Sequence, residues 1–598
     1  MHLIKYKIIK YIFIVLGIIM GPISFAAQPV DFNVRGMMPW HNFLSGPTSW
    51  DLNQYRDYIN WMAENNFNLL VLHNYSGGAE RYTNYVEPFV KVGYDGYSPP
   101  ASFDSTNTAR WGYLPKNPNH FIGSSKAMFA PYLKDGVFGN DIVKANGSNR
   151  DSYKITAKFL NNIIDYAHSK KIKVAIGFEY GVYPPEIFSL INLASYYPIE
   201  MLPDPTHPQS MQILNGTLDY IIKTYPRIDQ IWLWQREHEI HIPKEPLSKG
   251  MEFVFNNVKK QGGLPNNDLI FSAAWSYLYI LNANKYVHQF SPNIEVVAAG
   301  WGGDNQFMPI LETLDRNLPK NVKLAALNPN WGQNKQPNFF SKIAKNRSIF
   351  VIPWLEGDYQ LWHPQSRVSV LDEQLKLAAS QKVDGVIGTH WRTSDIKLNM
   401  NFFADRLRGD LSHPESKDYI ASYYSRLLSL PPSNQLIVDL ISLDRDEIFK
   451  AFTSPEYLPY DWTWGRLNDP LRELILRIIK NSQKNIALAK SKEVEKELLY
   501  LFYTFKFVME LDRVSVAIEP MAKLRDMYIL KKNFTRDEFL AARDSLEKAE
   551  ITSLVDIYTH RVRSRGELGV LSSINQKLVP YYNQVSSFAT QYERYEKK

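Results

Sequence analysis

Short apolar runs, each followed by a segment with helical periodicity, recur through the middle of this 598-residue chain. Continuous apolarity is typical of parallel strands that are covered on both faces. Eight such runs match the strands of a (β/α)8 TIM barrel in number, order and spacing. We therefore predict strands at 67–73, 173–179, 230–235, 269–275, 294–301, 322–328, 349–355 and 385–391.

The segments between these runs predict the helices of the barrel. Apolar residues recur every three or four positions in 152–169, 209–225 and 366–382. A doubly wound open sheet is the competing architecture, but the glycine-rich phosphate loop expected after its first strand is missing. The stretch from 74 to 150 has little periodicity, and a loop that long is usually functional. It includes a candidate strand at 88–93, which would shift the numbering of every later strand.

After about residue 410 the sequence becomes almost continuously helical. Heptad-like patterns at 471–490, 493–514 and 535–550 predict an all-α domain that follows the barrel. The expected domains are a signal peptide at 1–26, a barrel at 27–410 and a helical domain at 411–598.

The first 26 residues have the order of a cleaved secretory signal. Residues 1–10 are basic through Lys5, Lys7 and Lys10, residues 11–20 are almost wholly apolar, and small residues stand at Ser24 and Ala26. A membrane anchor is the alternative, but this apolar run is shorter than the roughly 20 residues that span a bilayer. We expect a secreted or periplasmic protein without stable membrane insertion.

Composition excludes several kinds of chemistry. The chain has no cysteine, so disulfides, thiolate nucleophiles, cysteine-bound zinc and iron–sulfur clusters are excluded. Its net charge of +7 is small and scattered, whereas nucleic-acid binding needs clustered Lys and Arg. We expect neither a cofactor nor a nucleic-acid partner.

Acidic and aromatic residues gather where the predicted strands end, which is where barrel active sites lie. Flat rings stack on sugar faces, and glycoside cleavage uses one protonated and one ionised carboxyl group, so this combination predicts a carbohydrate substrate. We assign the acid to Glu237, with Glu239 as the alternative. Strand alternation places both residues on one side, so their spacing does not choose between them. The nucleophile or base is Glu356, with Asp358 as the alternative.

Other polar and aromatic side chains at these ends are candidate substrate ligands. They are His41, His73, Asn74, Glu179, Arg236, Trp275, Trp301, Asp304, Asn328, Trp331, Trp354, His390, Trp391 and Arg392. The arginines could pair with a substrate carboxylate. The histidines are expected to bind sugar hydroxyls or to be satisfied core residues rather than metal ligands. Trp232 and Trp234 are expected to be core residues that pack between strand and helix.

Four segments resemble a known group of enzymes. RGMMPWH (35–41) and FNLLVLHNYSG (67–77) resemble the start of the barrel in secreted bacterial glycoside hydrolases, and PWLEGDYQLWHPQ (353–365) and GTHWRT (388–393) resemble their late-strand motifs. The group comprises α-glucuronidase-like and related barrel glycosidases of families 67, 115 and 20. The resemblance implies hydrolysis of a glycan or glycoside, including one that bears a uronic acid.

Three functions therefore compete. The first is a secreted glycoside hydrolase that uses two carboxyl groups and no cofactor. The second is a glycan-binding barrel that keeps the aromatic residues without the chemistry. The third is a metal-dependent hydrolase using His73, Glu179, His238 or His390, although the HxH pair typical of such barrels is missing after the first predicted strand.

Overall fold

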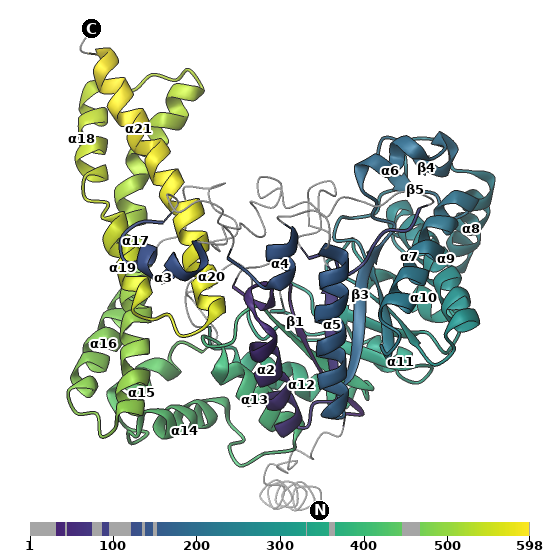
Figure 1. Ribbon diagram of the computed structural model, residues 1–598, viewed down its shortest axis with the longest axis horizontal. Helices are drawn as coiled ribbons and strands as arrows, with labels where there is room; N and C mark the ends of the chain where they lie inside the picture. The colour runs from purple at the N-terminus through teal and green to yellow at the C-terminus, as the bar shows by residue number, and fades with distance from the viewer. Residues whose placement is uncertain are drawn as a thin grey trace, which may run out of the picture.

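The computed structural model describes residues 32–41, 45–74, 87–94, 121–133, 138–146, 152–330, 332–357, 365–444 and 467–596. Eight parallel strands close into a barrel in the order β1-β10-β9-β8-β7-β6-β3-β2 (Figure 1). They are β1 (Val34–Pro39), β2 (Leu69–Asn74), β3 (Lys173–Tyr180), β6 (Gln230–Gln235), β7 (Glu295–Ala299), β8 (Lys323–Leu327), β9 (Ile349–Ile352) and β10 (Gly385–His390). The predicted barrel followed by helices is confirmed.

One of the eight predicted strands is wrong and one barrel strand was not predicted, so the total of eight still agrees. The barrel begins one strand earlier, at β1, whose Pro39 pairs with His390 of β10 and whose Met37 pairs with Leu70 of β2. The run at 269–275 lies instead in helix α9 (Asn267–Phe290), which the side chain of Asn266 caps. The candidate strand at 88–93 forms no strand.

Both errors have a physical cause. Arg35 and Gly36 interrupt the apolar pattern of β1, so the strand lacks the continuous apolarity of its neighbours. Helix α9 contacts α7 (Pro208–Thr224), α8 (Lys249–Gln261) and α10 (Leu311–Asn317), and most of its N-terminal half is buried. A helix covered on several sides is as apolar as a buried strand, and a short window does not separate the two.

The other predicted barrel helices are present. The helices around the strands include α2 (Leu52–Glu64), α5 (Ser152–Ser169), α7, α12 (Val368–Ser380) and α13 (Lys397–Leu407). A small lobe after β3 holds α6 (Pro185–Leu190), β4 (Tyr196–Tyr197) and β5 (Leu202–Pro203). In Figure 1 this lobe lies on the opposite side of the barrel from the C-terminal helices.

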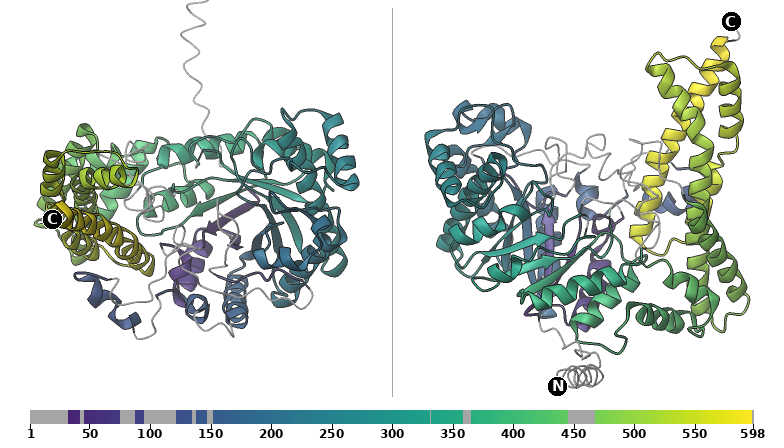
Figure 2. Two further views of the ribbon diagram at one scale, coloured as in Figure 1. Left: turned by 90° about the horizontal axis from the view of Figure 1, so that it is seen from above. Right: turned by 180° about the vertical axis from the view of Figure 1, so that it is seen from behind.

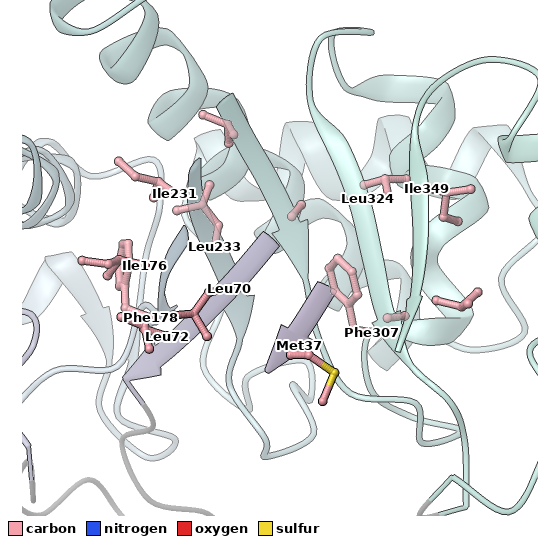
Figure 3. Packing of buried hydrophobic residues seen from close by; sticks show 14 of the residues in the cluster. Met37, Leu70, Leu72, Ile176, Phe178, Ile231, Leu233, Phe307, Leu324 and Ile349 are labelled. Atoms are coloured by element: carbon pink, nitrogen blue, oxygen red, sulfur yellow. The ribbon is translucent and has the colours of Figure 1, made fainter. Parts of the chain in front are cut away.

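Alternation along the strands produces two separate cores. Leu70, Ile176 and Leu233 belong to the core between strands and helices, and Figure 3 shows them among the other outward-facing side chains. Trp232 and Trp234 are wholly buried, as expected of core residues, but they face the inside of the barrel rather than a helix.

The C-terminal helices form a core of their own beside the barrel (Figures 1 and 2). The helices are α14 (Ser416–Leu428), α15 (Gln435–Ile441), α16 (Asp469–Ile486), α17 (Lys492–Ile529), α18 (Arg536–Leu546), α19 (Ile551–Thr559), α20 (Arg565–Ser573) and α21 (Val579–Glu596). Phe121 and Phe129 join this core from the segment around α3 (Ser125–Leu133). The domain boundaries at 26 and 410 stay predictions, and 1–26 lies outside the described residues. Within the described ranges, every helix is too short or too polar to cross a bilayer.

The packing inside the barrel predicts a large cost for a cavity there. Trp232 is wholly buried and lies 6.2 Å from the ring of Phe350 across the barrel. We expect Trp232→Ala to lower the free energy of unfolding by about 3–5 kcal/mol in urea denaturation. The control Phe253→Ala, at a residue that is 68% exposed, should change it by less than about 0.5 kcal/mol. Equal effects of the two substitutions would contradict this packing.

Candidate active site

Five tryptophans meet at the carboxyl ends of the barrel strands, and we call them the tryptophan layer. They are Trp40, Trp234, Trp301, Trp354 and Trp391, which lie within two residues of the last residue of β1, β6, β7, β9 and β10. Ring centroids of Trp40 lie 5.9 Å from Trp234, 5.5 Å from Trp301 and 6.1 Å from Trp391. The rings of Trp354 and Trp391 are 5.2 Å apart. Five strands thus contribute to one buried aromatic cluster at this end of the barrel.

Two indole N–H groups of this layer lack a partner in the protein. Nε1 of Trp234 and of Trp354 are buried and make no hydrogen bond within the described part of the chain. A buried donor without an acceptor costs about 1–3 kcal/mol, so it marks a place where a ligand or water supplies the acceptor. His73 lies between Trp40 and Trp234, with centroid distances of 5.0 Å and 4.8 Å.

Glu179 is the acidic side chain of β3 that faces the barrel interior. It lies on the same face of β3 as Ala175, an interior residue, and Gly177, where an added Cβ would lie 2.8 Å from Nδ1 of His73. Its Oε1 accepts the backbone N–H of Glu237 at 3.2 Å, so the backbone of the predicted acid lies beside it, after the neighbouring strand β6. The carbonyl of Glu237 accepts from Gln306 Nε2 at 2.6 Å.

Arg236 is the cation next to this pair. Burial lowers its pKa to about 10, and the charges of Glu179 and Glu200 oppose that shift. Glu239, the alternative acid, points elsewhere: its carboxylate lies 3.4 Å from Nε2 of His241, on a side chain that is 43% exposed. The structure therefore separates Glu237 from Glu239, which spacing alone does not.

Glu356 is held in a structural ion pair. It is wholly buried, and its Oε1 accepts the backbone N–H groups of Trp391 and Arg392 at 2.8 Å and 2.5 Å. Its Oε2 accepts from Nε of Arg392 at 2.7 Å. Three donors thus occupy both oxygens, an arrangement that disfavours the predicted role of nucleophile or base. Arg392 in turn gives Nη1 to Asp395 at 2.6 Å, so its Nε and Nη1 both bind acidic side chains of the protein itself.

Two predicted ligand histidines are satisfied core residues, the other role expected for them. Nδ1 of His41 lies 2.9 Å from Oε2 of Glu87, and its Nε2 lies 3.0 Å from the hydroxyl of Tyr55. Nδ1 of His390 donates to the carbonyl of Arg392, and its Nε2 accepts from the hydroxyl of Tyr58 at 2.6 Å. Neither ring has a nitrogen left for a sugar hydroxyl.

The remaining predicted ligands are scattered. Trp275 lies inside α9 rather than at a strand end, where it stacks on Tyr180 and donates Nε1 to the carbonyl of Pro203. The Nδ2 of Asn328 lies 3.3 Å from Oε1 of Gln336, beneath the loop after β8, and Asp304 is exposed. Asn74 ends β2. Trp331 and Asp358 lie outside the described residues.

Trp40 joins the site without having been a predicted ligand. It follows β1, the one strand that its sequence pattern hides, so no strand-end signal marks it. Once β1 is recognised, Trp40 is expected to face the barrel interior, because it lies two residues after the inward-facing Met38. Among the described residues, no group of three His, Asp or Glu side chains could hold a metal ion.

No family model matches the chain, and no curated protein sequence matches it. Its fold is similar to that of a glycoside hydrolase family 138 enzyme targeting pectin rhamnogalacturonan II, with a TM-score of 0.40 and 11% identity over 89% of this chain and 62% of that chain. An O-GlcNAc hydrolase mutant of Thermobaculum terrenum has a TM-score of 0.41 and 12% identity over 95% and 97%. An exo-β-N-acetylglucosaminidase of Vibrio harveyi has a TM-score of 0.36 and 12% identity over 69% and 58%.

These three solved structures are all of glycan-cleaving enzymes. The chain spans less than two thirds of the length of the first and the third. Likeness at these scores and identities brings no substrate, mechanism or residue role to this chain.

The buried histidines predict how stability depends on pH. Burial and the neighbouring His41 lower the pKa of His73 to about 3, and burial lowers the pKa of His390 to about 4. An unfolded histidine has a pKa of about 6.5, so between these values the unfolded state binds more protons. We expect each histidine to remove about 2 kcal/mol of unfolding free energy as the pH falls from 7 to 5.

Urea denaturation across this pH range measures the effect. The variant His390→Gln should show a shallower pH dependence than the parent, by about half of the two-histidine contribution. Substitution of the exposed His288 is the control. If His390→Gln and the parent lose the same free energy between pH 7 and pH 5, His390 is not neutral in the folded protein.

Proposed function

We propose that this chain is a secreted glycoside hydrolase that binds a sugar against the tryptophan layer. The observation that carries the proposal is the meeting of five indole rings, two of them with unpartnered buried N–H groups, at the carboxyl end of a closed barrel. Ring faces stack on the apolar faces of sugars, and indole N–H groups donate to hydroxyl oxygens. Carbohydrate is the ligand class whose chemistry matches both features.

Glu179 and Glu237 are the carboxyl groups best placed to cleave the bond. Glu179 is the penultimate residue of β3 and Glu237 follows the neighbouring strand β6, and Glu179 faces the interior that the tryptophan layer closes. Glu179 accepts the backbone N–H of Glu237, and the charge of Arg236 lies close to it. We therefore assign Glu179 as the nucleophile or base, in place of Glu356.

Glu237 remains the proposed acid. A carboxyl group beside an ionised carboxylate keeps its proton more readily, because two like charges at close range repel each other. A protonated Glu237 would donate to the leaving oxygen, while Glu179 would attack the anomeric carbon or activate a water. The two roles differ because Glu179 receives a hydrogen bond from the backbone of Glu237.

A glycan-binding barrel without activity is the second candidate. The engagement of Glu356 by three donors favours it, because the carboxylate that the sequence places opposite the acid is no longer at hand. Assays of glycan binding and of glycoside cleavage separate the two functions. Binding of a glycan to the parent protein, without turnover of any glycoside in a broad panel, would support the second function.

Substitution of the two carboxyl groups tests the proposed chemistry. We expect Glu179→Gln and Glu237→Gln each to lower kcat by a factor of about 10² to 10⁴ on the best glycoside of the panel, because each removes one proton-transfer or nucleophilic group. Glu239→Gln, two residues from the proposed acid, is the matched control and should stay within a few-fold of the parent. Activity of Glu237→Gln close to that of the parent would refute the assignment.

Export is tested separately. The full chain, produced in a bacterium with a general secretion pathway, should appear in the periplasm or medium with Ala27 as its first residue, because residues 1–26 have the order of a cleaved signal. N-terminal sequencing and intact mass measure this. Replacing Ala26 with Arg should leave the signal uncleaved. A cytoplasmic protein that keeps residues 1–26 would contradict the export proposal.

A further inference from the structure

A chain of buried charges runs from the barrel to the C-terminal helices. It begins at Glu356, passes through Arg392 to Asp395, and continues to Arg561, which follows α19. Asp395 divides its oxygens between the two arginines: Oδ2 accepts from Arg392 Nη1 at 2.6 Å, and Oδ1 accepts from Arg561 Nη2. Arg561 is wholly buried.

Tyr500 of α17 closes the chain on the helical side. Its hydroxyl donates to Oδ1 of Asp395, lies 2.8 Å from Oε1 of Glu567, and accepts from Nη2 of Arg561 at 3.1 Å. Burial alone would raise the pKa of Asp395, but Arg561 and Arg392 hold it below its ordinary value. Asp395 is thus an anion clamped between the barrel and the helices.

The barrel end of this charge chain supports one member of the tryptophan layer. Glu356 accepts the backbone N–H of Trp391 as well as that of Arg392, so the position of its carboxylate fixes the peptide that carries the Trp391 ring. The ring of Trp391 in turn contacts Trp354 and Trp40. A shift of Glu356 is therefore passed directly to the aromatic surface.

Helix α20 makes a second set of contacts with this end of the barrel. Arg565 donates Nε to the carbonyl of Ser49 at 2.6 Å and Nη2 to that of Gly139 at 2.7 Å. A Cβ at Gly566 would lie 2.5 Å from the carbonyl oxygen of Ser45. One at Gly46 would lie 2.6 Å from the carbonyl oxygen of Trp391. Helix α20 is therefore packed closely against the loop that follows β1, and that loop is packed closely against the residues that follow β10.

We propose that Arg561 and Tyr500 are positioning residues of the sugar site, acting through Asp395, Arg392 and Glu356 on Trp391. The inference rests on the proposed function for the role of the layer, but its geometric content does not. Buried ion pairs are costly, and isosteric apolar residues often replace them without loss of stability. We therefore infer that this buried charge chain, which connects the barrel to the helical core, serves to position the ring of Trp391.

Two substitutions and one control test the proposal in the full-length chain. Arg561→Met removes the cation that neutralises Asp395, and Tyr500→Phe removes only a hydroxyl. Arg563→Met is the matched control, because the Arg563 guanidinium also lies over the Tyr500 ring, 4.1 Å from its centroid, but pairs with Glu497 rather than with Asp395.

The first measurement is independent of activity. The protein is labelled with 5-fluorotryptophan, and the Trp391 resonance is assigned by its loss in Trp391→Phe. We expect Arg561→Met and Tyr500→Phe to shift or broaden the Trp391 resonance, whereas Arg563→Met leaves it in place. An unshifted Trp391 resonance in both variants would overturn the proposal. If Arg561→Met does not fold, Tyr500→Phe decides the question alone.

The second measurement connects the charge chain to the proposed reaction. On the glycoside that the parent cleaves, Tyr500→Phe should raise KM by about tenfold while kcat changes less, because the sugar-stacking ring is displaced and the carboxyl groups are not. A loss of kcat without a change of KM would overturn the positioning role. If the parent cleaves no glycoside, the proposed function fails, and the fluorine spectra still decide whether the charge chain positions Trp391.

Discussion

The carboxylate of Glu356 and the guanidinium of Arg392 hold together the part of the molecule where the barrel, its aromatic surface and the C-terminal helices meet. Both groups are almost completely removed from water, so each depends on the other for the interactions that solvent would otherwise supply. Asp395 and Arg561 extend the same dependence to the helices. The ends of β9 and β10 are therefore fixed by charge as well as by strand pairing.

The ion pair matters for the site because contacts between tryptophan rings alone do not fix the orientation of each ring. Trp354 and Trp391 stand on the two strand ends that the ion pair joins, and their rings are 5.2 Å apart. On the other side of the barrel, Glu179 and Gln306 hold the backbone of Glu237 by hydrogen bonds. A sugar on the layer would thus meet a rigid aromatic surface on one side and a pair of carboxyl groups on the other.

The sequence predicts the barrel well because parallel strands and amphipathic helices leave periodic patterns that local windows detect. It does not separate the covered helix α9 from a strand, because burial on several sides makes that helix as apolar as a strand. It does not reveal β1, because Arg35 and Gly36 interrupt the apolar run. The positions of Glu237 and Trp391 follow from the strand ends. The engagement of Glu356 does not, because its partner Arg392 follows a different strand, β10, and Arg561 is 166 residues from Asp395.

A crystal structure of the Glu237→Gln variant with a bound glycoside tests the central claim most directly. The account predicts a sugar ring stacked on the tryptophan layer, with hydroxyls accepting from Nε1 of Trp234 or Trp354 and the glycosidic oxygen within hydrogen-bond distance of residue 237. A glycan bound elsewhere on the molecule, with both indole N–H groups still unpartnered, would contradict it.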